Sequence, residues 1–164
     1  SAEDDTEFTE IVGLLVKLVE ETVSLPERPL RFSVVGEGGK LPSQTTTTLA
    51  VVITELLQNA VDHGYPESIV EMESNSGKVT IEIDRKPDSL SVRVVDDGIG
   101  LPEEFEIETA QGLGLTIVRT FVETELDGVL TLRPAKKGSG TVAEVQIPGN
   151  RLLGPWDDAQ EPEV

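Results

Sequence analysis

The chain has 164 residues, which is enough to bury one hydrophobic core and too few for two ordinary domains. Its 31 acidic and 13 basic residues give a formal net charge of -18, so the chain repels phosphate backbones, and we expect neither nucleic acid nor an anionic membrane surface as a partner. The chain has no cysteine, which excludes a disulfide framework and a thiolate metal site.

The first predicted helix spans about residues 8–24. Asp4 and Glu7 precede it at the spacing of a capping box, and its apolar residues recur at helical spacing. These residues are Phe8, Ile11, Val12, Leu15, Leu18 and Val19. The apolar segment 11–19 is interrupted by Gly13 and Lys17 and is far below the roughly 18 residues that cross a bilayer. Because no signal peptide is recognisable either, we expect a soluble, cytoplasmic domain.

A strand, a loop and a second helix are expected next. Residues 30–34 alternate apolar and polar side chains, as in a strand with one buried face, and residues 36–43 are expected to form a loop. The threonines at 45–48 supply an N-cap for a helix that Gly64 ends. The residues of this helix that should face the core are Leu49, Val52, Ile53, Leu56 and Ala60.

The second half of the chain predicts four more strands and a third helix. Residues 79–83 and 90–94 alternate around a Pro-Asp turn and predict a hairpin. A helix is expected from about residue 112 to 126, followed by strands at 129–133 and 141–147. The apolar residues of this helix, which should be core residues, are Ile117, Val118, Phe121 and Val122.

These elements predict an α+β fold, in which three helices cover one face of a mixed five-stranded sheet and the other face is partly wet. We expect residues 1–148 to form this two-layer domain. Residues 149–164 are rich in proline and acidic side chains and are expected to form a loosely ordered tail.

The second helix carries a polar stripe. Glu55, Asn59 and Asp62 or His63 lie at i, i+4 and i+7 or i+8, so they share one face of an otherwise apolar helix. Taken alone, this stripe equally predicts an ordinary solvated face.

Three glycine motifs lie downstream of the stripe. Residues 96–100 read Asp-Asp-Gly-Ile-Gly and leave a strand, residues 112–115 read Gly-Leu-Gly-Leu and open a helix, and residues 138–141 read Gly-Ser-Gly-Thr and open a strand. Each motif alone predicts no more than a turn. Their order and separations, taken together with the polar stripe, predict the walls of one nucleotide pocket.

This set of motifs resembles the ATP-binding domain of sensor histidine kinases, in the ATPase superfamily shared with gyrase, Hsp90 and MutL. The resemblance implies the Bergerat-type ATP-binding fold, with ATP and Mg2+ as ligands. The acidic composition does not exclude a nucleotide, because ATP can arrive with magnesium and be held by backbone N–H groups.

The resemblance also implies a role for individual residues. Asn59 offers a neutral oxygen to Mg2+, and His63 reaches the nucleotide phosphates or is instead a cation at the end of its helix. Asp96 accepts the exocyclic N–H of adenine, and Gly98 and Gly100 let the backbone approach the base closely.

The third helix and the last strand contribute the remaining expected contacts. Backbone N–H groups at the start of the helix bind phosphate, with the help of the helix dipole. They belong to the motif Gly112, Leu113, Gly114 and Leu115. The Thr141 hydroxyl helps to fix the adenine-binding aspartate, commonly through water. Residues 101–111 are expected to form a lid over the nucleotide.

Two positions depart from the commonest family pattern. Glu55 stands where many histidine kinases have asparagine, whereas gyrase-type and anti-sigma-kinase relatives have glutamate. Its carboxylate orients or deprotonates a nucleophile, or it only orients a metal-bound water, and both roles stay open. Asp62 replaces a basic residue, so a direct phosphate contact is not expected there.

The single histidine, His63, belongs to the expected ATP site. We therefore expect the catalytic domain of a two-component sensor histidine kinase, which transfers the ATP γ-phosphate to a histidine on a dimerisation and phosphoacceptor domain absent from this chain, and signals through that domain to a response regulator. One alternative is a freestanding serine kinase of the anti-sigma-factor type. Another is a degenerate nucleotide-responsive binding module.

Overall fold

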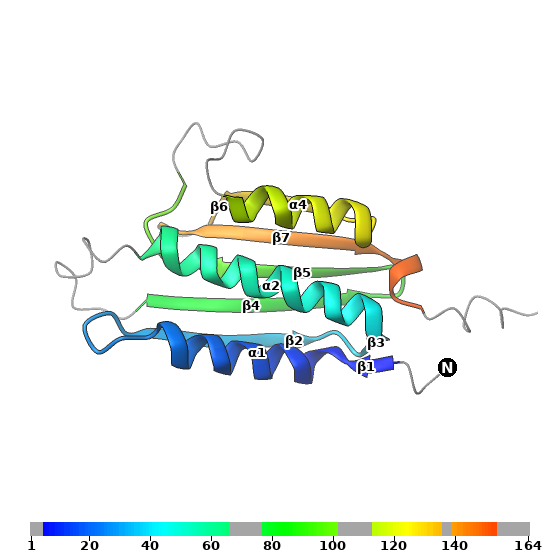
Figure 1. The fold of residues 1–164 in the computed structure, drawn as a ribbon, viewed down its shortest axis with the longest axis horizontal. Helices are drawn as coiled ribbons and strands as arrows, with labels where there is room; N and C mark the ends of the chain where they lie inside the picture. Colours follow the sequence, from blue (N-terminus) through cyan, green and yellow to red (C-terminus); the bar gives the residue numbers. More distant parts are fainter. Residues whose placement is uncertain (1–4, 66–76, 102–112, 136–138, 154–164) are drawn as a thin grey trace, which may run out of the picture.

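The computed structural model describes residues 5–65, 77–101, 113–135 and 139–153. Within these ranges the chain forms a sheet and a layer of helices that lies on one of its faces (Figure 1). The expected α+β sandwich is confirmed.

The main sheet contains five strands. They span Leu30–Glu37 (β2), Gly77–Lys86 (β4), Ser89–Asp96 (β5), Val129–Pro134 (β6) and Thr141–Pro148 (β7). Their order is β2-β4-β5-β7-β6; β2 and β4 are parallel, and the other neighbours are antiparallel. The expected hairpin is the β4–β5 pair.

Three helices cover the same face of this sheet: Phe8–Val23 (α1), Ser43–Gly64 (α2) and Leu113–Glu125 (α4) (Figure 1). All five residues that were expected to anchor α2 are buried. Since α2 lies between α1 and α4 and contacts both, its apolar stripe meets the sheet and its neighbours at once.

The two outer helices, α1 and α4, leave some large apolar side chains exposed. On α4, Val118 and Val122 are buried, but Ile117 is 51% and Phe121 is 38% exposed. On α1, Leu18 is 62% exposed. The core predictions for Ile117 and Phe121 are wrong because a helix at the edge of the layer buries only the narrow stripe that faces the sheet, and apolar residues beside that stripe remain in contact with water.

Side chains along β5 point alternately to the two faces of the sheet, which decides the face on which each residue lies. Leu90, Val92 and Val94 point into the core, and Asp96 follows them at the same period of two residues. Arg93 points to the opposite, open face of the sheet. The Asp96 side chain therefore lies on the face of the sheet that the helices cover.

The N-terminal segment contains a second, small sheet that the sequence did not reveal. Residues Asp5–Glu7 (β1) pair antiparallel with Lys40–Pro42 (β3), so the loop expected over residues 36–43 ends in a strand. Glu7 occupies the N-cap position of α1, yet its side chain makes no capping hydrogen bond, and Asp4 lies outside the described residues. The expected capping role of Glu7 is therefore wrong. Strands of three residues are too short to show a pattern in sequence.

The start of α2 also differs from expectation. The helix begins at Ser43, directly after Pro42, so the run of threonines lies inside the helix instead of capping it. The Thr47 and Thr48 hydroxyls donate to carbonyl oxygens four residues earlier, at 2.9 and 3.1 Å. Because the fixed φ of Pro42 suits both the strand end and the helix entry, it sets the boundary there.

Ordered packing continues beyond β7. Residues Gly149–Arg151 form a 3-10 turn (η3), Leu152 is buried, and the Arg151 carbonyl accepts a hydrogen bond of 2.7 Å from the Thr45 hydroxyl. Arg151 also pairs with Asp127 at 2.7 Å. Among the described helices, none has the length and hydropathy that would be needed to cross a membrane.

Candidate functional site

The polar stripe of α2 has the geometry that its spacing predicts. Glu55 and His63 are exposed and Asn59 is half-buried along one face of the helix. Asp62 is also exposed, and its Oδ1 accepts a hydrogen bond of 3.1 Å from the Gln58 amide one turn earlier. Asp62 is therefore part of the solvated side of the helix. The sequence predicted no direct phosphate contact at this position, because Asp62 replaces a basic residue.

Asn59 differs from its neighbours because part of its amide is hidden from water. Its Nδ2 atom is buried and has no hydrogen-bond partner among the described residues. A buried amide without partners is unfavourable unless another group satisfies it. This amide is the one polar group on the stripe that is both shielded and unsatisfied in the described part of the chain.

Asp96 ends β5 as a buried carboxylate. It is 5% exposed, its Oδ1 accepts the Gly98 N–H at 2.9 Å, and it also has a backbone hydrogen bond with Thr141. Burial raises the pKa of Asp96, and these two hydrogen bonds offset only part of that effect. No ion pair neutralises Asp96 within the ranges that the structure describes. Such a carboxylate is a strong acceptor for a ligand N–H.

Glycine contacts bring the end of α2 against the loop that follows Asp96. A Cβ added to Gly98 would lie 2.3 Å from the carbonyl oxygen of Gly64, so no side chain fits between the two backbones. The Gly64 carbonyl also accepts the Ile99 N–H at 3.0 Å. The predicted close approach at Gly98 is therefore made to another part of the chain, and it places the end of the polar stripe beside Asp96.

The start of β7 completes this side of the site. Thr141 pairs with Asp96 across the β5–β7 ladder. Gly140 has φ +128°, and a Cβ there would lie 2.1 Å from the Asp96 carbonyl oxygen, so only glycine fits. Gly100, with φ +84°, turns the chain next to Gly140. The structure thus brings together the stripe, the Asp96 segment and the Thr141 segment.

The remaining motif is only partly described. Gly112 and most of the expected lid, residues 102–111, lie outside the described residues, while Leu113 and Gly114 open α4. Leu115 is buried in the hydrophobic core. Any nucleotide contact by Leu115 must therefore be made by its backbone and not by its side chain.

The sequence did not single out Tyr65, which directly follows α2. Its hydroxyl lies 3.0 Å from the Lys78 carbonyl oxygen and 2.9 Å from the Asp97 backbone nitrogen, and it donates a short hydrogen bond to the Asp97 carboxylate. Burial, together with the bond to Asp97, raises the pKa of Tyr65 well above its ordinary value, so the phenol keeps its proton. Tyrosine after a helix gives no sequence signal of such a contact.

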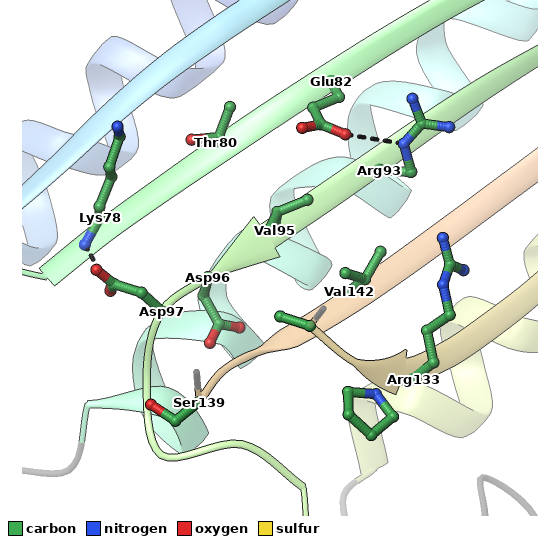
Figure 2. A pocket seen from close by; sticks show the side chains of 12 residues that line it. Lys78, Thr80, Glu82, Arg93, Val95, Asp96, Asp97, Arg133, Ser139 and Val142 are labelled. Atoms are coloured by element: carbon green, nitrogen blue, oxygen red, sulfur yellow. Dashed lines mark hydrogen bonds and ion pairs between the residues drawn. The ribbon is translucent and has the colours of Figure 1, made fainter. Parts of the chain in front are cut away.

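A cavity of about 550 Å³ lies on the open face of the sheet (Figure 2). Its lining includes Arg93 and Arg133 of the open face, together with Asp96, Asp97 and Ser139 from two of the predicted motifs. The cavity therefore reaches the Asp96 segment and the start of β7 from the open face, while α2 lies on the opposite face of the sheet.

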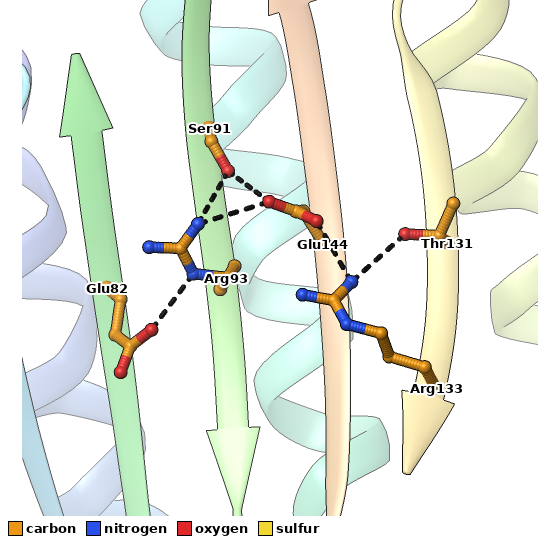
Figure 3. Close-up of polar contacts among 6 residues, drawn as sticks. All are labelled: Glu82, Ser91, Arg93, Thr131, Arg133 and Glu144. Atoms are coloured by element: carbon orange, nitrogen blue, oxygen red, sulfur yellow. Dashed lines mark hydrogen bonds and ion pairs between the residues drawn. The ribbon is translucent and has the colours of Figure 1, made fainter. Parts of the chain in front are cut away.

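The two arginines that line this cavity, Arg93 and Arg133, are paired with carboxylates (Figure 3). Glu144 accepts from Arg93 at 3.2 Å and from Arg133 at 2.9 Å, and Arg93 also binds Glu82 at 2.9 Å. Burial alone would raise the pKa of Glu144, but hydrogen bonds from Ser91, Arg133 and Arg93 outweigh it, and the net pKa is lowered. The network links strands β4, β5, β7 and β6 across the open face and neutralises the charges of Arg93 and Arg133.

Comparison with known proteins gives the same family as the motifs of the sequence. Residues 44–151 match the family described as histidine kinase-, DNA gyrase B-, and HSP90-like ATPase. The chain is 38% identical over 151 residues to the sensor histidine kinase PdtaS of Mycobacterium tuberculosis, covering 92% of this chain and 29% of that protein. The chain thus spans less than a third of the length of this relative.

Solved structures show the same fold. The histidine kinase domain of a blue-light activated histidine kinase from Erythrobacter litoralis has a TM-score of 0.71 at 23% identity, over 89% of this chain and 63% of that one. The histidine kinase ThkA in complex with the response regulator protein TrrA has a TM-score of 0.69 at 22% identity, over 88% of this chain and 41% of that one.

Proposed function

This chain belongs to the family of histidine kinase-, DNA gyrase B-, and HSP90-like ATPases, and we propose that it acts as the ATP-binding catalytic domain of a two-component sensor histidine kinase. The observation that carries the proposal is the meeting of three distant segments at Asp96. The end of α2 contacts it through Gly64 and Gly98, and the start of β7 contacts it through Thr141.

Asp96 recognises the adenine base in this proposal. Its buried, ionised carboxylate accepts a hydrogen bond from the exocyclic amine, which is a charge-assisted contact in a place from which water is largely excluded. Because Gly98 and Thr141 hold the carboxylate by backbone contacts, it is oriented before the base arrives. The Thr141 hydroxyl adds a contact to Asp96 through water.

Asn59 fits Mg2+ that enters with the nucleotide. The described residues hold no cluster of three or more histidine, aspartate or glutamate side chains. The donor set is instead that of an ion held by one amide oxygen, with phosphates and waters supplying the rest. The Asn59 Oδ1 would face the ion, and the buried Nδ2, which has no acceptor among the described residues, would donate to a phosphate oxygen of the nucleotide. When bound, Mg2+ neutralises charge between the phosphates.

The remaining contacts surround the phosphates. The exposed His63, one helical turn beyond Asn59, contacts them from α2, and backbone N–H groups at residues 112–115 contact them from the start of α4. We assign Glu55 to the nucleophile, which it orients or deprotonates. If it only orients a metal-bound water, its replacement will affect affinity and rate together.

The phosphoryl acceptor is a histidine of a separate dimerisation and phosphoacceptor domain. An imidazole nitrogen attacks the γ-phosphorus, a P–N bond forms, and the bond to the β,γ-bridging oxygen breaks so that ADP leaves with the electron pair. The phosphoryl group then passes from that domain to a response regulator, the class of protein with which ThkA was solved. Because it uses ATP, we place the reaction in the cytoplasm.

The test combines the chain with γ-labelled ATP and Mg2+, with and without a separately supplied phosphoacceptor domain of a sensor histidine kinase. We expect acid-labile label on the acceptor and none on this chain alone. The variant Asp96→Asn should lose labelling, and Asp88→Ala, in the exposed β4–β5 turn, should retain it. Acid-stable label, as on serine, would contradict histidine transfer, and acid-labile label on the chain alone would contradict the role given to His63.

A further inference from the structure

Tyr65 and Asp97 form a cross-chain contact next to the proposed adenine site. Tyr65 is 8% exposed, and its hydroxyl reaches Asp97 at both the backbone nitrogen and the carboxylate. The carboxylate oxygen Oδ1 that accepts from Tyr65 also accepts the Lys78 N–H at 2.8 Å. One oxygen of Asp97 therefore accepts hydrogen bonds both from Tyr65, the residue after α2, and from Lys78, at the start of β4.

Tyr65 is itself held in place from several sides. The Arg28 guanidinium donates to the Tyr65 carbonyl at 3.1 Å, and the Tyr65 N–H continues the α2 ladder to Val61 at 3.1 Å. Its ring lies against Gly77, where an added Cβ would come within 2.5 Å of a ring carbon. A side chain fixed at its backbone and ring can act as a rigid support for the group that it touches.

Asp96 is held by backbone groups alone. Its carboxylate is held by the Gly98 N–H, which belongs to the same short loop, and by Thr141. If the loop rotates at Asp97, then Gly98 moves and the orientation of the Asp96 carboxylate changes with it. The Ile99 N–H holds the far side of this loop to the Gly64 carbonyl, and Asp97, the residue between Asp96 and Gly98, holds its near side to Tyr65 and Lys78.

We propose that Tyr65 and Asp97 are positioning residues that set the orientation of Asp96, and thereby determine how strongly the site prefers adenine over bases without an exocyclic amine. This inference rests on the proposed function. Neither side chain binds the nucleotide in this role: the Asp97 carboxylate is engaged by the Tyr65 hydroxyl and the Lys78 N–H, and Tyr65 acts through Asp97.

The experiment measures discrimination as well as affinity. Magnesium complexes of ATP and of inosine triphosphate, which has a carbonyl in place of the 6-amino group, are titrated by calorimetry into the 164-residue chain and its variants. In Tyr65→Phe and Asp97→Ala we expect the ratio of the two affinities to fall by about threefold to tenfold, because hydrogen bonds that hold Asp97, and through it the loop that orients Asp96, are lost.

Two variants serve as matched controls. Asp97→Asn removes the same charge as Asp97→Ala but keeps the oxygen that Tyr65 and Lys78 share, so it should restore most of the preference for ATP. Asp88→Ala removes an exposed aspartate from the β4–β5 turn and should behave as the parent chain. Thermal unfolding of each variant shows that the protein measured is folded.

The outcomes separate the inference from the proposed function. An unchanged ratio of the two affinities in Tyr65→Phe overturns the inference. If both affinities fall equally, the pair is only structural, and if neither changes, the pair does not act on Asp96. Asp97→Asn behaving like Asp97→Ala would also overturn the inference. A parent chain without preference for ATP would overturn the adenine site itself, and the inference with it.

Discussion

Replacing Asp96 by asparagine removes the charge of the proposed adenine acceptor and keeps its size. The Gly98 N–H would occupy the asparagine Oδ1, as it occupies the same oxygen of the aspartate at 2.9 Å. The amide NH2 would then face the adenine amine, donor against donor. A hydrogen bond to a charged group is worth about 1.5 to 3 kcal/mol, so ATP affinity should fall about ten- to a hundredfold.

Stability should not fall with affinity. Burial raises the pKa of Asp96, so the folded state favours the protonated carboxyl. That stabilising contribution is complete below the ordinary aspartate pKa and is lost as the pH rises through the raised value, so the ionised carboxylate opposes folding at neutral pH. Because asparagine carries no charge, Asp96→Asn should unfold at a temperature equal to or above that of the parent chain.

Calorimetric titration with ATP and thermal unfolding of the same samples test both parts. The parent chain should also lose affinity as the pH falls through the raised pKa of Asp96, and Asp96→Asn should not show this dependence. Unchanged ATP affinity in a folded Asp96→Asn protein would refute the assignment of Asp96 to adenine. A large loss of thermal stability would refute the account of the buried charge.

Three further substitutions test other parts of the structure. Asn59→Ala should lose the magnesium-dependent part of ATP affinity, measured by titration with and without Mg2+, and nearly all phosphotransfer to a supplied acceptor. Glu55→Gln should leave ATP affinity within a few-fold and slow phosphotransfer by roughly a hundredfold or more; a proportional loss of both would make Glu55 a metal-orienting residue. Glu144→Gln removes the shared partner of Arg93 and Arg133 and should lower the free energy of unfolding by about 1 to 3 kcal/mol in urea titrations, with ATP affinity unchanged. Because the pKa of Glu144 is lowered, its contribution is present above the ordinary glutamate pKa and is lost as the pH falls through the lowered value, so the difference should disappear in acid.

The sequence by itself determined the architecture and which segments were proposed to form the site. Apolar residues with a period of two predicted the β4–β5 hairpin and also placed Asp96 on the core face, because alternation continues to the end of the strand. Helical spacing predicted both the buried face of α2 and the common face of Glu55, Asn59 and His63. These are local periodicities, and a local pattern is readable wherever the element is long enough to repeat it.

Tertiary structure decided what depends on neighbours distant in the chain. The exposure of Ile117 and Phe121 follows from the position of α4 at the edge of the helical layer, which its own spacing does not encode. The contact between Tyr65 and Asp97 joins residues 32 positions apart, and each is an ordinary surface-compatible residue in sequence. Such contacts arise only when strand order and helix packing bring separate segments together, so the support of the site is set by the fold, whereas its chemistry is set by the motifs.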